Sequence, residues 1–143
     1  MKRLFYIPLL ILFLFNCKKD KIDTQPDEIM KPLVGRWNLK ETEQIVNGEK
    51  VWVPFAGSEA VYTNFRFDGI ELDENGKASC CAPKIYNINN TIFEVTPRVA
   101  VAYDYDCTLV DCMPCPSYDI EVNGNQMMIS RCSLARSKYR KAE

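Results

Sequence analysis

The sequence predicts an all-β domain, built as a single antiparallel meander that closes into a barrel of eight to ten strands. Three observations support this prediction: apolar residues alternate over short runs, turn signals separate those runs, and no stretch has a long helical period. Consecutive strands joined by tight hairpins can close on themselves and leave no unpaired edge. Because hairpins alone do not establish closure, a β-sandwich is the alternative. The 143 residues can hold one domain with a substantial core.

Turn residues mark the ends of the expected strands. Asn47-Gly48, Asn89-Asn90 and the segment 123–125 each join two alternating runs, as expected of β-hairpins, and 73–76 is a further turn. An irregular, cysteine-rich loop is expected over 104–116. The strands are expected at 37–46, 50–53, 61–67, 77–81, 85–88, 92–95, 99–103, 118–122, 127–130 and 137–140.

Residues 1–16 have the features of an export signal. Lys2 and Arg3 precede an almost wholly apolar run over 4–15, which is shorter than the roughly 20 residues of a membrane span. The run Leu-Phe-Asn-Cys at 14–17 resembles a lipobox, although Asn16 stands where Gly, Ala or Ser is usual. The resemblance implies cleavage before Cys17 and acylation of that residue with fatty acids such as palmitate. A plain secretory signal or an uncleaved signal anchor is the alternative.

The expected lipoprotein has three parts: the signal peptide 1–16, the lipidated cysteine with a polar tether 17–32, and the β-domain 33–143. A short helical turn is expected around 27–33. Two or three acyl chains hold a protein stably on a membrane, whereas one binds reversibly. We therefore expect the protein in the cell envelope, on the outer membrane of a Gram-negative bacterium.

The charged residues and the lack of histidine limit the possible functions. The chain has 18 basic and 19 acidic residues with no evident basic face, so nucleic-acid binding has little electrostatic support. Without histidine, Ser-His-Asp and Cys-His catalytic sites and His-ligated metal sites are excluded. We therefore expect a non-catalytic, monomeric domain with no metal and no cofactor.

The cysteine count supports the lipoprotein interpretation. Seven cysteines is an odd number, and assigning Cys17 to lipid leaves an even set. In an oxidising compartment an even set predicts up to three disulfides, which would fasten the loop 104–116 to the barrel. The sequence does not choose among the possible pairings. The six remaining residues are Cys80, Cys81, Cys107, Cys112, Cys115 and Cys132.

Cys112 and Cys115 allow two other interpretations. Their C-x-x-C spacing is that of thiol–disulfide oxidoreductases, but Pro116 follows directly and the next segment is predicted to be a strand and not a helix. The same spacing is half of a structural zinc site, which Cys80 and Cys81 would have to complete. The aspartates at 104, 106 and 111 lack the EF-hand spacing, so we interpret them as a solvated acidic surface.

Gly35-Arg36-Trp37 opens the first expected strand and resembles the G-x-W signature of lipocalins, especially the small lipocalin-like domains of bacterial lipoproteins. The resemblance implies a barrel closed at one end by Trp37, with an arginine from near the last strand stacked over the ring. Arg136 and Arg140 are the candidates for this cation–π contact. The Tyr-Asp-Tyr run at 103–105 is loosely similar to the family's second motif.

Three functions follow as hypotheses. The first is a membrane-anchored lipocalin-like domain that binds a small apolar ligand or a cell-envelope partner. The second is a protein-interaction or inhibitor module that uses the loop 104–116, and the third is an oxidoreductase at Cys112 and Cys115. A ligand cavity would be lined by inward-facing residues of the strands, although the same residues can instead fill a solid core. These residues are Phe65, Phe67, Tyr86, Ile88, Val101 and Tyr103.

Overall fold

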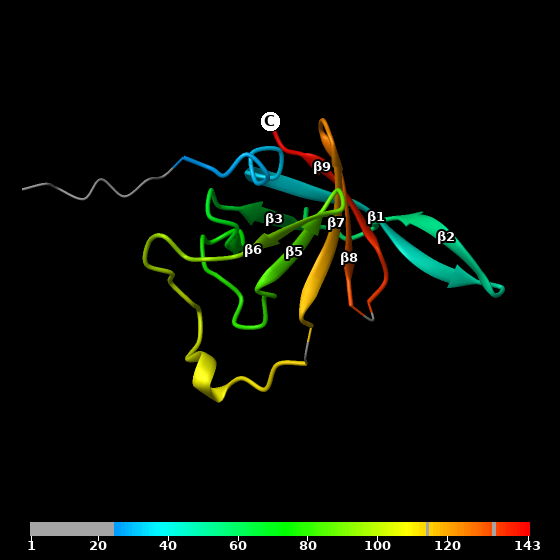
Figure 1. Ribbon diagram of the computed structural model, residues 1–143. Helices are drawn as coiled ribbons and strands as arrows, with labels where there is room; N and C mark the ends of the chain where they lie inside the picture. Colours follow the sequence, from blue (N-terminus) through cyan, green and yellow to red (C-terminus); the bar gives the residue numbers. More distant parts are fainter. Residues whose placement is uncertain (1–24, 114, 133) are drawn as a thin grey trace, which may run out of the picture.

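The computed structural model describes residues 25–113, 115–132 and 134–143, and the regular secondary structure within them is almost entirely β-strand. Nine strands form one sheet that curls into a half-barrel (Figure 1). The predicted all-β class and the predicted number of strands are confirmed. The expected signal peptide and Cys17 lie outside the described residues. In the described part, no helix is long and apolar enough to cross a membrane.

Eight of the nine strands lie where strands were expected, and β4 was not predicted. Their order in the sheet is β4-β3-β1-β9-β8-β7-β5-β6, and β2 pairs with the second half of β1. Their bounds are β1 Gly35–Val46, β2 Glu49–Pro54, β3 Tyr62–Phe65, β4 Glu71–Leu72, β5 Ile85–Ile88, β6 Thr91–Glu94, β7 Ser117–Asn123, β8 Gln126–Arg131 and β9 Ser137–Lys141. A short 3-10 helix, η2, spans Cys107–Leu109.

The three predicted hairpins are confirmed, and their turn residues explain why they form. Asn47 and Gly48 both have positive φ values, 52° and 84°, as do Asn89 and Asn90 at 47° and 66°. Two consecutive positive φ values match the twist of antiparallel strands, and asparagine and glycine tolerate them best. These turns set the register of β1 with β2 and of β5 with β6.

Several details differ from the closed antiparallel meander that was expected. β5 pairs with β7 in parallel, because the connection 95–116 crosses over before the chain re-enters the sheet. In the described part of the chain, the end strands β4 and β6 do not pair with each other, so the sheet remains open. The expected strands at 99–103 and 77–81 are reduced to isolated bridges at Tyr103 and Ala78.

The inner face of the sheet carries a filled apolar core. Trp37, Phe65, Tyr86 and their neighbours are fully or almost fully buried there. The N-terminal turn, in which Met30 N–H donates to Asp27 C=O at 2.9 Å, adds Met30 and Leu33 to this core. The folded domain therefore includes this turn and begins before residue 33.

A lysine, and not one of the two expected arginines, lies over Trp37. The register places Trp37 opposite Lys141, whose Nζ is 5.2 Å from the ring centroid. Asn38 faces Arg140, so strand alternation directs Arg140 to the outer face. Trp37 Nε1 also donates to Leu33 C=O at 2.7 Å, which fastens the N-terminal turn across this end of the sheet.

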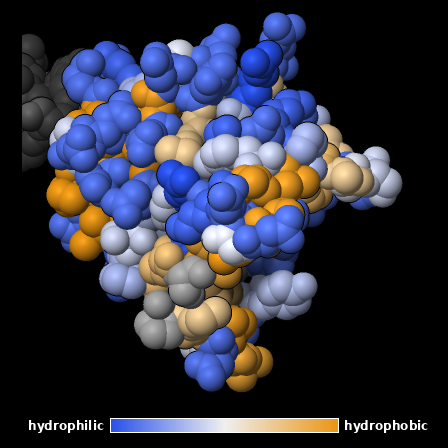
Figure 2. Space-filling view, turned by 90° about the vertical axis from the view of Figure 1, so that its right-hand side faces the viewer, coloured by the Kyte–Doolittle hydropathy of each residue, from blue (hydrophilic) through white to orange (hydrophobic). Residues whose placement is uncertain are grey.

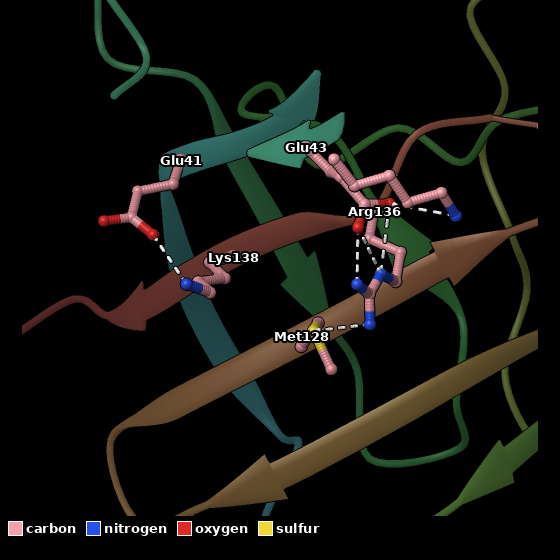
Figure 3. A network of polar contacts seen from close by, with 6 residues as sticks. Glu41, Glu43, Met128, Arg136 and Lys138 are labelled. Atoms are coloured by element: carbon pink, nitrogen blue, oxygen red, sulfur yellow. Dashed lines mark hydrogen bonds and ion pairs between the residues drawn. The ribbon is translucent and has the colours of Figure 1, made fainter. Parts of the chain in front are cut away.

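Arg136 instead belongs to a polar network on the outer face, shown in Figure 3. Its guanidinium donates to both carboxylate oxygens of Glu43, and Lys138 donates to Glu41 at 2.8 Å. Both cations also lie over the Trp52 ring, with Lys138 Nζ 3.9 Å from its centroid. The hydrogen bonds from Arg136 lower the pKa of Glu43. The network joins β9 to the projecting β1–β2 hairpin.

Candidate interaction site

The long connection between β6 and β7 is largely exposed to solvent. In Figure 1 it hangs below the sheet, with η2 at its lowest point, while the N-terminal turn and the C-terminus lie at the upper end. Irregular loops of this length are uncommon inside a compact domain, and many of them are either functional or linker segments. We call residues 103–113 the cystine loop.

A buried ion pair fixes the beginning of this connection. The Arg66 guanidinium donates to both oxygens of Asp68, at 2.7 and 2.8 Å, and to the carbonyls of Val99 and Ala100. The backbone N–H of Arg98 donates to Asp68 at 2.8 Å. Burial alone would raise the pKa of Asp68, but these donors hold it below the usual value.

Two disulfides fasten the cystine loop, and a third holds the start of β7. Cys80 pairs with Cys107, Cys81 with Cys112, and Cys115 with Cys132. The adjacent Cys80 and Cys81 thus attach the loop at two points. The prediction of three disulfides among these six residues is confirmed.

The same pairing contradicts the oxidoreductase hypothesis. A dithiol redox site needs a bond between Cys112 and Cys115, whereas each of them pairs with a distant cysteine. Pairing also removes the thiolates that the zinc alternative requires. The disulfides of this protein therefore support its structure.

The cystine loop exposes apolar side chains to an unusual extent. Leu109 is 84% exposed, Tyr105 76% and Met113 71%, and Leu134 lies exposed two residues beyond Cys132. Figure 2 shows hydrophobic residues at the lower tip of the molecule, where Figure 1 places η2. Contiguous apolar surface on a soluble domain commonly marks an interaction site.

The loop is also acidic. Residues 99–130 contain no lysine or arginine, while Asp104, Asp106 and Asp111 lie within the cystine loop. Asp106 accepts hydrogen bonds from the backbone N–H and the hydroxyl of Thr108, which lower its pKa and cap η2. Apolar and negatively charged groups therefore share one surface.

A cleft of about 620 Å³ lies between this loop and the inner face of the sheet. Tyr105 and Val110 form part of its wall, and Asp73 and Asp104 lie beside each other in its lining. The backbone N–H of Lys77 donates to Asp73 and lowers its pKa.

The lining of the cleft includes a polar cluster that crosses the half-barrel. Arg131 donates to Glu71 and to the hydroxyl of Tyr139, each at 2.9 Å, and the Thr63 hydroxyl donates to Glu71 at 2.7 Å. Although burial disfavours its charged form, the Glu71 carboxylate raises the pKa of Arg131. The guanidinium lies 5.1 Å from the centre of the Tyr118 ring.

Tyrosines form the apolar side of this cluster. Tyr86 stacks on Tyr118 with ring centroids 6.0 Å apart, and its pKa is raised by burial. Its hydroxyl has no hydrogen-bond partner among the described residues. The cleft therefore lies above packed aromatic rings and a charge pair that is already satisfied.

No protein-family model, no curated protein and no solved structure matches this chain.

The six residues expected to line a ligand cavity lie elsewhere. Phe65, Tyr86 and Ile88 are packed in the core, Phe67 and Val101 are half-buried, and Tyr103 is exposed on the cystine loop. None of them contributes to the cleft or to a larger, shallow groove of about 1350 Å³ on the polar outer face. Phe65, Tyr86 and Ile88 belong to a solid core, which is the alternative to a cavity.

The sequence singled out Cys80, Cys81 and Asp104, which line the cleft, but not the strand residues Tyr118, Arg131 and Tyr139. Tyr118 and Tyr139 could have been found as inward positions by alternation within their strands. Glu71 could not have been identified as an inward position in this way, because β4 has only two residues and therefore no periodicity.

Proposed function

We propose that the protein is a lipid-anchored, non-catalytic lipoprotein of the cell envelope whose lipocalin-like domain binds a partner protein through the cystine loop. The observation that carries the proposal is the set of exposed apolar side chains on a doubly cross-linked loop. Cross-links hold such a loop in one shape, so it loses little conformational freedom when a partner binds. The lipobox-like segment and the odd cysteine count support the anchor.

A partner protein fits these features better than a small apolar ligand does. The interior of the sheet is filled by its own side chains, and the cleft beside it contains the charged pair Glu71–Arg131. Small apolar ligands are usually held in concave sites that bury most of their surface. In contrast, Leu109 and Met113 project outward, where only another surface can cover them.

Photocrosslinking in intact cells tests the proposed interaction. A benzoylphenylalanine at position 109 is expected to form a protein adduct of discrete mass. Ile45, which is 73% exposed on the β1–β2 hairpin, provides a matched control position. An adduct with phospholipid alone, or the same protein adducts at both positions, would contradict the proposal.

Fatty-acid labelling tests the anchor separately. The full chain is expected to incorporate an alkyne analogue of palmitate and to fractionate with membranes. The Cys17→Ala variant is expected to lose the label, and its other cysteines are expected to give no free thiol in Ellman's assay. Label retained by the variant would refute acylation at Cys17.

A further inference from the structure

The charges around the cleft indicate what kind of surface the partner presents. Of the charged residues that line the cleft, Arg131 is neutralised by Glu71 at 2.9 Å, which leaves Asp73, Asp104 and Lys77. The cystine loop adds Asp106 and Asp111 and no cation. The surface that the partner approaches is therefore strongly negative.

The negative charge of the cystine loop and the cleft argues against a lipid membrane as the surface that covers them. Exposed apolar side chains near a membrane anchor can insert into a bilayer, but amphipathic segments that do so combine them with lysine and arginine. Anionic lipid headgroups repel carboxylates, and inserting Leu109 would bring Asp106 and Asp111 against the headgroups. A positively charged protein surface meets the same residues with complementary charge.

Two side chains connect the exposed loop to the cleft. Tyr105 and Val110 belong to the apolar surface and also line the cleft, next to Asp104. A partner that covers Leu109 and Met113 therefore also reaches the mouth of the cleft. A long basic side chain can lay its apolar stem along Tyr105 and place its charge beside the carboxylates.

Resting on the proposed function, we infer that the partner binds through a basic segment. The segment presents a lysine or arginine beside Asp104, at the mouth of the cleft, and places its apolar side chains on Tyr105, Leu109 and Met113. The charge at the mouth provides selectivity and rapid association, and the apolar contacts provide affinity.

Peptide binding to the full chain tests this inference. The lipoprotein is placed in nanodiscs of zwitterionic lipid, and the probes are two fluorescent peptides of equal length and leucine content, one with lysines and one with glutamates. The lysine peptide is expected to bind at least about tenfold more tightly, with an advantage that shrinks as salt is raised. Leu109→Ser is expected to weaken its binding at every salt concentration.

Two double variants that remove the same charge separate the effect of the loop carboxylates on binding from the effect of net charge. Asp104→Asn/Asp111→Asn is expected to weaken lysine-peptide binding about tenfold and to reduce its salt dependence. Asp119→Asn/Glu121→Gln removes the same charge from exposed positions of β7 and is expected to change binding little. Equal losses in both variants, equal affinity for both peptides or no peptide binding would overturn the inference.

The outcomes also separate this inference from the proposed function. If position 109 gives a protein adduct in cells but the lysine peptide is not preferred, the proposed function stands and the partner is not basic. A preference for the lysine peptide without any cellular protein adduct counts against the proposed function itself. Binding of the chain to vesicles containing anionic phosphatidylglycerol through Leu109 would overturn both in favour of a membrane.

Discussion

Arg131 on β8 donates to the carboxylate of Glu71 on β4 at 2.9 Å, although 60 residues separate them in the sequence. β4 is the end strand of the sheet and β8 lies near its middle, so the pair spans the interior of the half-barrel. Both side chains are largely shielded from water. The contact thus ties the open edge to the body of the sheet beneath the cystine loop.

Removing one member of this pair is expected to be costly. Glu71→Gln leaves the shielded Arg131 charge without its counterion, so we expect the free energy of unfolding to fall by about 2–4 kcal/mol, measured by urea denaturation. Glu41→Gln is the control, because its ion pair with Lys138 is far more exposed, and it should change this energy by less than about 1 kcal/mol.

The double variant Glu71→Leu/Arg131→Met extends this test. Replacing both charges with apolar groups should recover much of the lost stability, since no unpaired charge remains. If the single variant were as stable as the parent, the pair would have no structural role.

A non-reducing peptide map is expected to reveal four fragments joined in a row by the three disulfides. Cleavage by trypsin and by a protease that cuts before aspartate yields 78–84, 106–110, 111–118 and 132–136. The disulfides link them in the order 106–110, 78–84, 111–118, 132–136. Mass spectrometry that finds 111–118 as a separate, internally bonded peptide would instead show a Cys112–Cys115 bond.

Acid is expected to weaken the fold through Asp68. Its pKa is lower in the folded than in the unfolded chain, so the folded state binds fewer protons. Its contribution to stability is complete above the unfolded pKa of about 3.9 and is lost as the pH falls through the folded value. Asp68→Asn should lower stability at pH 7 by about 1–3 kcal/mol and flatten its decline below pH 5.

Denaturation curves across the acidic range measure this effect. Glu59→Gln, at an exposed position, serves as the control and should retain the parent's decline. An unchanged acid profile in Asp68→Asn would assign the acid sensitivity to other carboxylates.

The cation over Trp37 can be identified by stability measurements. Lys141→Gln removes the charge 5.2 Å from the ring and is expected to lower the free energy of unfolding by about 0.5–1 kcal/mol. Arg140→Gln, one residue earlier and on the other face, should have a smaller effect. A larger loss of stability in Arg140→Gln than in Lys141→Gln would instead support the arginine–Trp37 contact that the G-x-W resemblance implies.

Local features of the fold were predictable from sequence because they depend on neighbouring residues. Asn47-Gly48 and Asn89-Asn90 set the hairpins through their own backbone preferences, and alternation placed Tyr86 and Ile88 on the inner face. The odd cysteine count predicted an even set of paired thiols without the structure.

Features that join distant segments were not predictable in the same way. The parallel pairing of β5 with β7 depends on the path of the connection 95–116, which has no periodic signal. The partners of Cys112 and Cys115 and the contact of Glu71 with Arg131 depend on that path as well. The candidate interaction site is built mostly from such contacts.

The pairing of β1 with β9 has a consequence for folding kinetics. β9 lies between β1 and β8, so both of these strands keep an unpaired edge until residues 137–141 have been synthesised. Hairpins such as β7–β8 can form early, but ordering of the whole sheet depends on contacts of high sequence separation, which slow folding. The chain is thus expected to pass through an aggregation-prone stage during synthesis, and deletion of residues 137–141 would make that stage permanent.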